Sequence, residues 1–162
     1  MKKLMLLLVL CMLLVGCSKS NSKNYAIVEN IILNQSTFEN VQNTLPNANF
    51  KETYDEALGI FVLSDGIYSE YTINNVSGEL RFDFDENNYL IHVFFSPNEY
   101  SKENGDALKT WLFDKYKDYE QTTKDTGFVF TNGSENIELY ITENPIDNTK
   151  YHGLYIEWTV VE

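Results

Sequence analysis

The fold is decided by the stretch Gly78–Phe95, GELRFDFDENNYLIHVFF, in which apolar and polar side chains alternate, stop at a turn and then resume. Leu80, Phe82 and Phe84 are separated by charged residues, and this period of two predicts a strand with one buried and one wet face. Asp85-Glu86-Asn87-Asn88 has the composition of a turn, and Tyr89–Phe95 returns as the second strand. We therefore predict a β-hairpin here.

A helix is expected before this hairpin. Ser36 followed by Glu39 matches a capping box, and Phe38, Val41 and Leu45 recur at helical spacing before Pro46. Strands are then predicted at Gly59–Leu63 and Ile67–Ile73, on either side of a Ser-Asp-Gly turn. The apolar segment Tyr25–Leu33 fits a helix or a strand equally well.

The same order of elements follows the hairpin. A helix starting near Ser101 carries one apolar face, formed by Leu108, Trp111, Leu112, Tyr116 and Tyr119, and we place Lys109 and Lys115 on its polar side. Strands are predicted at Gly127–Thr131, Ile137–Thr142 and Gly153–Val161. The expected fold class is α+β, with two helices packed on one face of an antiparallel β-meander, in the form of a diverged helix-plus-strands repeat if the two halves are related.

The N-terminus does not belong to this fold. Met1-Lys2-Lys3 precedes twelve consecutive apolar residues, Leu4–Val15. This run is too short for a membrane-spanning helix, which takes about 20 residues, and has the length of a signal-peptide core. We predict a signal peptide over residues 1–16, a tether over 17–25 and one α+β domain over 26–162. If cleavage occurred at another position, a soluble secreted protein would result.

The junction Leu14-Val15-Gly16-Cys17 resembles the lipobox of bacterial lipoproteins. The resemblance implies that a diacylglycerol is attached to the Cys17 thiol and that the signal is cut just before this residue. It places the chain in a bacterial cell envelope: on the periplasmic face of the outer membrane in a Gram-negative cell, or on the outer face of the plasma membrane in a Gram-positive one. No cofactor is expected beyond this covalent lipid.

The charge of the chain limits its partners. The sequence holds 12 Lys and Arg against 24 Asp and Glu, a net charge of −12. Loss of Lys2 and Lys3 with the signal would change this to −14. An acidic surface repels nucleic acid, so we expect membrane attachment through the lipid and an envelope protein as partner, for which a basic protein would suit the charge. An acidic surface is also a common solubility feature.

Residues for catalysis or metal binding are scarce. Both cysteines, Cys11 and Cys17, lie in the N-terminal segment, which leaves no thiol for a disulfide, a zinc site or a nucleophile in the domain. His92 is expected on a strand face with Leu90 and Phe94, as a structural residue rather than a catalytic one, and His152 in a loop. Asp83-x-Asp85-x-Asn87 resembles half a calcium loop, but a turn explains it better, because its sixth and twelfth positions are wrong.

Tyrosine is abundant, with 11 residues. Exposed tyrosines favour binding surfaces, and we name Tyr68, Tyr140 and Tyr155 as the candidate binding face. The alternative is that these rings cap the edges of the sheet.

Two segments, Ile32–Pro46 with its Ser-Thr start and Leu-Pro end, and Gly78–Leu90 with its alternating phenylalanines, are similar to small envelope lipoproteins of the SmpA/BamE type and to the fold they share with β-lactamase-inhibitor proteins. The resemblance implies a helix-plus-meander unit that binds and does not catalyse. The expected function is a non-catalytic protein-binding lipoprotein with a role in envelope assembly or maintenance, or in inhibition or immunity. An envelope hydrolase or a small-ligand binder is the alternative.

Overall fold

A computed structural model describes residues 26–28, 30–46, 48, 52–55, 57, 60–63 and 71–161. The elements in chain order are α2 (Phe38–Thr44), β1 (Glu52–Asp55), β2 (Ile60–Leu63), β3 (Tyr71–Ile73), β4 (Val76–Phe84), β5 (Leu90–Pro97), α3 (Lys102–Lys115), β6 (Glu120–Lys124), β7 (Gly127–Thr131), β8 (Glu135–Glu143) and β9 (Tyr151–Val160). The predicted signal peptide, Cys17 and Tyr68 lie outside the described residues. No described helix combines the length and the apolar character needed to cross a membrane.

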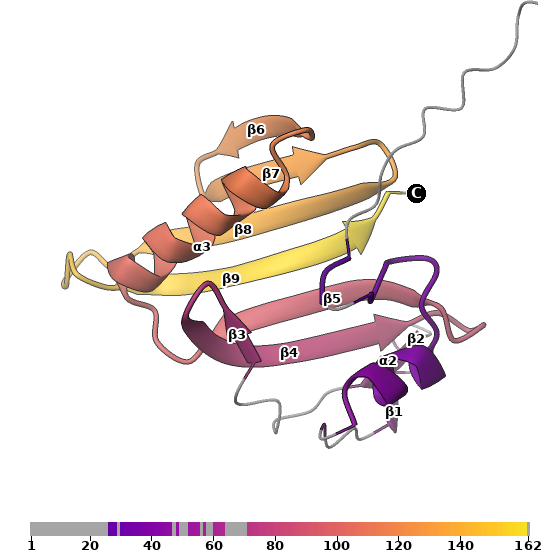
Figure 1. Cartoon of the computed structure of the whole chain (residues 1–162). Helices are drawn as coiled ribbons and strands as arrows, with labels where there is room; N and C mark the ends of the chain where they lie inside the picture. The colour runs from indigo at the N-terminus through magenta and orange to yellow at the C-terminus, as the bar shows by residue number, and fades with distance from the viewer. Residues whose placement is uncertain are drawn as a thin grey trace, which may run out of the picture.

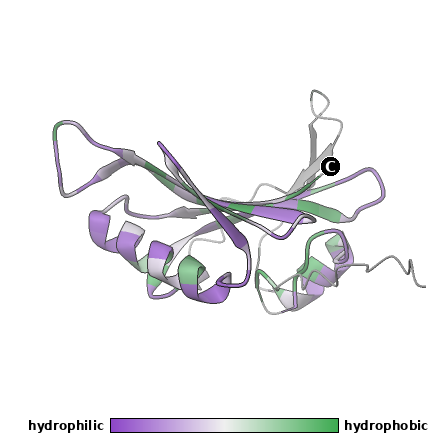
Figure 2. Cartoon of the chain, turned by 90° about the horizontal axis from the view of Figure 1, so that it is seen from above, coloured by the Kyte–Doolittle hydropathy of each residue, from purple (hydrophilic) through white to green (hydrophobic). Residues whose placement is uncertain are grey.

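All the described strands belong to one antiparallel sheet. Its order is β1-β2-β4-β5-β9-β8-β7-β6, and β3 pairs with β4 beside this path (Figure 1). The central pair is β5 with β9, which lie far apart in the sequence, and β6 forms one end of the path. Figure 2 shows α2 and α3 against the same side of the sheet.

The predicted α+β class is wrong, because the fold is mostly β. The described helices contain 7 and 14 residues, whereas the nine described strands make one continuous sheet that carries the architecture. The predicted meander also fails at the centre, where β5 pairs with β4 and with the last strand, β9, rather than with the next strand along the chain, β6. Two strands were missed: β1, and β6, whose residues Glu-Gln-Thr-Thr-Lys show no apolar alternation.

The predicted hairpin is confirmed as β4 and β5, but its register contains an irregularity. Phe84 pairs with Leu90, whereas Asp83 pairs with His92, so the register shifts by one residue between them. A one-residue shift moves all following side chains to the opposite face of the sheet. Leu90 is therefore buried in the core, while His92 turns to the other face; the prediction that these two residues share a face is wrong.

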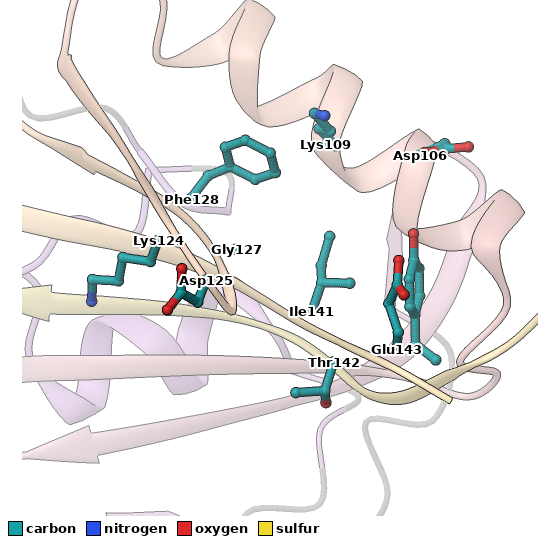
Figure 3. Close-up of a pocket in the computed structure, with 10 residues that line it drawn as sticks. Asp106, Lys109, Lys124, Asp125, Gly127, Phe128, Ile141, Thr142 and Glu143 are labelled. Carbon is teal, nitrogen blue, oxygen red and sulfur yellow. The ribbon is translucent and has the colours of Figure 1, made fainter. Parts of the chain in front are cut away.

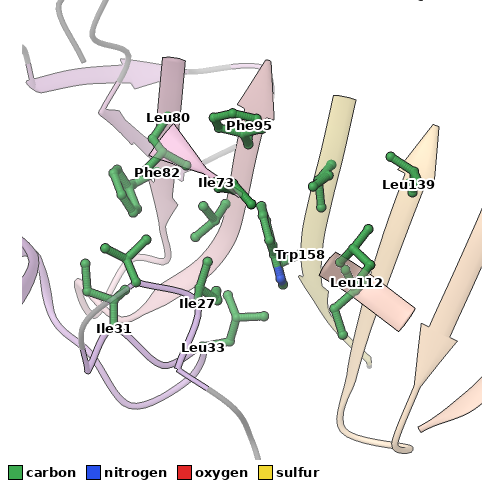
Figure 4. Close-up of a cluster of buried hydrophobic side chains, with 14 of the residues drawn as sticks. Ile27, Ile31, Leu33, Ile73, Leu80, Phe82, Phe95, Leu112, Leu139 and Trp158 are labelled. Atoms are coloured by element: carbon green, nitrogen blue, oxygen red, sulfur yellow. The ribbon is translucent and has the colours of Figure 1, made fainter. Parts of the chain in front are cut away.

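The core lies between the sheet and a layer formed by the described helices and residues 26–28 and 30–35. Leu80, Phe82 and Phe84 of β4 face it, together with Trp158 of β9. Ile27, Ile31 and Leu33 fill the same layer, each at most 4% exposed (Figure 4). The segment Tyr25–Leu33 was predicted as a helix or a strand; its described residues, 26–28 and 30–33, instead form a turn that is bridged between Val28 and Ile31.

The N-cap residue was predicted correctly for α3 and was wrong by one residue for α2. Ser101 caps α3 as expected, accepting a hydrogen bond from the amide of Asn104 at 3.1 Å. At α2 the predicted Ser36–Glu39 capping box is wrong by one residue: Thr37 is the N-cap and forms the box with Asn40. Ser36 instead accepts a hydrogen bond from the amide of Ile32 at 3.0 Å.

Lys115 connects α3 to the N-terminal segment. Its Nζ donates to the carbonyl oxygens of Ala26, at 2.7 Å, and Ile27, at 3.2 Å, and lies 4.6 Å from the centre of the Trp111 ring. Burial lowers the pKa of Lys115 to about 8, although the charge of Glu135 acts in the opposite direction. The prediction that Lys115 belongs to the polar side of the helix is therefore wrong.

Candidate functional site

The side of the sheet opposite the helices carries a mixed aromatic and charged surface. Cross-strand pairing aligns Arg81, Phe94, Glu157 and Glu138 in one row across β4, β5, β9 and β8. Asp83 with His92, and Tyr140 with Tyr155, form neighbouring pairs on the same side. We call these eight residues the open face, because both described helices pack on the other side (Figure 2).

An ion cluster holds one end of the open face. His92 Nδ1 lies 2.5 Å from Asp83 Oδ2, and His92 Nε2 lies 2.8 Å from Glu157 Oε1, within ion-pair distance. Arg81 Nε donates to the second oxygen of Asp83 at 3.1 Å. Asp83 is only 3% exposed, so these contacts neutralise a buried carboxylate.

The cluster keeps His92 protonated. Burial alone lowers the pKa of this imidazole, but the contacts and charges of Asp83 and Glu157 outweigh it and raise the pKa from 6.5 to about 9. In the same way, His92 lowers the pKa of Glu157. Both ring nitrogens of His92 thus face carboxylates, which leaves neither of them available to take a proton from a serine or to bind a metal.

The remaining catalytic and metal candidates do not assemble into a site. His152 is exposed near the start of β9 and is not one of the open-face residues. Asp85 closes the predicted turn by accepting from the amides of Asn87 and Tyr89, at 2.9 and 2.7 Å, so the turn interpretation of this segment is confirmed. Within the described ranges, no group of three or more His, Cys, Asp or Glu side chains is placed to hold a metal ion.

Two of the three predicted binding-face tyrosines come together. Tyr140 and Tyr155 are direct cross-strand partners, and their rings stack with centres 4.6 Å apart and planes 14° apart. Phe94 adds a third ring, with its centre 4.8 Å from that of Tyr155, and we call Phe94, Tyr155 and Tyr140 the aromatic row. Sequence reasoning missed Phe94 because only the shifted register of the hairpin turns it away from the core.

A second charged pair lies beside the aromatic row. Lys124 of β6 donates to Glu138 of β8 at 2.7 Å, reaching across β7. Its side chain remains 49% exposed, so the pair adds little stability. The open face therefore presents three adjacent rings between two sets of paired charges.

A separate hollow of about 460 Å³ lies between α3 and the β7–β8 strands (Figure 3). Phe128 and Ile141 supply apolar lining, and Asp106, Lys109 and Glu143 supply charges of both signs. Lys109 Nζ lies 4.4 Å from the centre of the Phe128 ring, a cation–π contact.

Comparisons with known proteins yield one similar structure and no matching family. No family model matches the chain, and no curated protein matches it. A solved structure, described as a DUF4309 family protein (YjgB) from Bacillus subtilis, aligns over 82% of this chain and 84% of its own, with 10% identity and a TM-score of 0.45. A similarity this low transfers neither fold nor function, and the resemblance to SmpA/BamE-type lipoproteins stays a prediction.

Proposed function

We propose that the chain is a lipid-anchored protein of a bacterial cell envelope, whose open face binds a protein partner without catalysing a reaction. The observation that carries the binding proposal is the row Phe94, Tyr155 and Tyr140, three half-buried rings at the middle of a face without a described helix over it. Aromatic side chains of this kind contribute most to binding energy when a partner removes them from water.

Preorganisation supports a binding role. The stacked tyrosines are fixed by their strands, and the charged residues beside them are already engaged by His92 and Lys124. A partner therefore meets a surface with little side-chain freedom left to lose on association. The net charge of −12 favours approach of a basic protein.

The binding proposal is tested by placing a photo-crosslinking phenylalanine analogue at Tyr140 or Tyr155 in cells that make the full chain. Tyr89, which is 42% exposed on the β4–β5 turn, is the matched control position. We expect an adduct from the two open-face positions and none from Tyr89. The captured partner is then purified, and its affinity for the wild type is compared with that for Tyr155→Ala, which is expected to bind at least about tenfold more weakly. Equal affinity, or an equal adduct from Tyr89, contradicts the proposal.

The anchor is a separate part of the proposal and rests on the lipobox resemblance at Leu14–Cys17. Mass spectrometry of the mature N-terminal peptide should show a lipidated Cys17, and Cys17→Ser should release the protein from the membrane fraction. An unmodified peptide that begins before Cys17 refutes the anchor and leaves the binding proposal intact.

The hollow between α3 and the β7–β8 strands supports a second candidate function, small-ligand binding. Its apolar floor and charges of both signs suit a zwitterionic molecule such as an amino acid or short peptide. Calorimetric titration with dipeptides tests this candidate. Lys109→Ala should abolish any heat of binding, whereas Lys102→Ala, at the start of the same helix, should not.

A further inference from the structure

The outer edge of the sheet at β6 is open and polar. Each residue from Glu120 to Lys124 is exposed, and the strand pairs with β7 on one side only within the described part of the chain. An edge strand has no paired strand on its outer side, so it directs unpaired backbone N–H and C=O groups outward. Thr122 and Thr123 are β-branched and favour an extended strand. The edge is thus competent to accept another strand.

The charge pattern of β6 selects its own copy as that strand. In an antiparallel pair centred on Thr122, all five residues find a partner: Glu120 faces Lys124 of the other copy, and Lys124 faces its Glu120. A parallel pair would instead oppose glutamate to glutamate and lysine to lysine, which is destabilising. A lysine on an edge strand ordinarily discourages pairing, but Glu120 makes this lysine complementary in a single register.

The geometry points to a two-fold symmetric dimer of this chain, formed by antiparallel pairing of β6 with β6. Glu120, Thr122 and Lys124 point to the same side of the sheet as the open face, since Lys124 reaches Glu138 there. The dimer therefore extends the sheet and places two open faces on one continuous surface. The interface is small, with five residue pairs, so association is weak and depends on protein concentration. The inference does not depend on which partner the open face binds.

Sedimentation equilibrium on the full chain in a non-ionic detergent tests the dimer. Glu120→Lys puts two like-charged pairs into the interface and leaves the Lys124–Glu138 contact in place. Lys124→Glu puts two like-charged pairs of the opposite sign into the interface, and it also removes the Lys124–Glu138 contact. We expect each variant to raise the dimer dissociation constant at least about tenfold. Lys117→Glu, an equal change in charge at an exposed residue just before β6, should leave it unchanged.

Mixing the two variants is the decisive measurement. Glu120→Lys chains and Lys124→Glu chains are complementary to each other, so an equimolar mixture should form dimers at concentrations at which each variant alone is mostly monomeric. A wild type that stays monomeric at every concentration overturns the inference. So does a dimer that neither charge reversal weakens, or a mixture that fails to associate although both variants keep the wild-type circular dichroism spectrum.

The register has its own test in a full chain that carries Cys11→Ser and Cys17→Ser. Thr122→Cys places two thiols directly opposite each other at the symmetry axis, where an added oxidant should join them rapidly in a disulfide. Thr123→Cys, one residue along, faces Gln121 of the other copy and should be joined at least about tenfold more slowly. Equal rates for the two variants overturn the proposed register.

Discussion

Replacement of His92 by glutamine tests the ion cluster under the open face. The folded protein holds the pKa of His92 at about 9, against 6.5 for the free side chain. Linkage converts this difference into about 3 kcal/mol of stability near pH 6, where both the folded and the unfolded chain carry the proton. Because the folded pKa is the higher one, this stability is complete below pH 6.5 and is lost as the pH rises toward 9.

The measurable consequence is a slope in stability with pH. From pH 6.5 to 8 the His92 contribution should fall by about 1.5 kcal/mol. Above about pH 8, Lys115 acts in the opposite direction, because its lowered pKa means that the folded chain then binds fewer protons than the unfolded one. Urea denaturation across this interval should show the decline in the wild type and a flatter profile in His92→Gln.

The exposed His152 provides the matched control, since His152→Gln should leave the slope unchanged. At pH 6 His92→Gln should be less stable than the wild type by about 3 kcal/mol, because Asp83 keeps Arg81 but loses the imidazolium. A wild-type stability that stays flat between pH 6.5 and 8, or an NMR titration of His92 with its midpoint near 6.5, refutes the reasoning.

Three further predictions test the fold. Gly127 has a φ of +138°, and an added Cβ would lie 1.8 Å from the carbonyl oxygen of Leu139. Gly127→Ala should therefore lower the free energy of unfolding in urea by more than about 2 kcal/mol. Gly133→Ala, whose Cβ meets open space, should lower it by about 1 kcal/mol. Lys115→Met removes the bonds to the carbonyls of Ala26 and Ile27, so amide hydrogen exchange at Ile27 and Ile31 should accelerate at least about tenfold, with Lys109→Met as the unaffected control. Trp158 Nε1 donates to the Tyr116 hydroxyl at 2.9 Å, so a double-mutant cycle of Trp158→Phe with Tyr116→Phe should give a coupling of about 1 kcal/mol, and a coupling near zero would contradict the bond.

The sequence predicts those elements whose signal is local. Alternation over Gly78–Phe95 and the turn at Asp85 suffice to place β4 and β5, and Ser101 with the apolar spacing that follows it places α3. The strand β6 has no such signal, because all of its residues are exposed and its stability comes from pairing with β7. The pairing of β5 with β9 is likewise absent from local pattern, since it joins segments about 60 residues apart and forms only in the folded chain.

In the candidate site too, the sequence predicts which strand face a residue occupies, but not the contacts that depend on the pairing register. Tyr140 and Tyr155 can be assigned to one face from the alternation in β8 and β9, but their stacking requires the register that pairs them directly. Asp83 was expected on the wet face, and it does point away from the core, yet it is 3% exposed because His92 and Arg81 close over it. The contact with His92 has no sequence signature, since a shift of one residue in β5 decides which side chain meets Asp83. Arg81, in contrast, is two residues from Asp83 on the same strand, and alternation alone puts both on one face.

The register shift in β5 connects the core, the ion cluster and the aromatic row. Without it, His92 would lie opposite Phe82 and enter the core, where a charged imidazole has no counterion. With it, Leu90 still fills the core, while His92 meets Asp83 and Glu157, and Phe94 reaches Tyr155. The contacts of His92 then favour the shifted register over the regular one, because only the shifted register adds an imidazolium to the Arg81 contact of the buried Asp83. The contacts of His92 with Asp83 and Glu157, and of Phe94 with Tyr155, therefore depend on one irregularity in the β4–β5 hairpin. A change that removes the shift should abolish the pH dependence of His92 and the aromatic contact of Phe94 together.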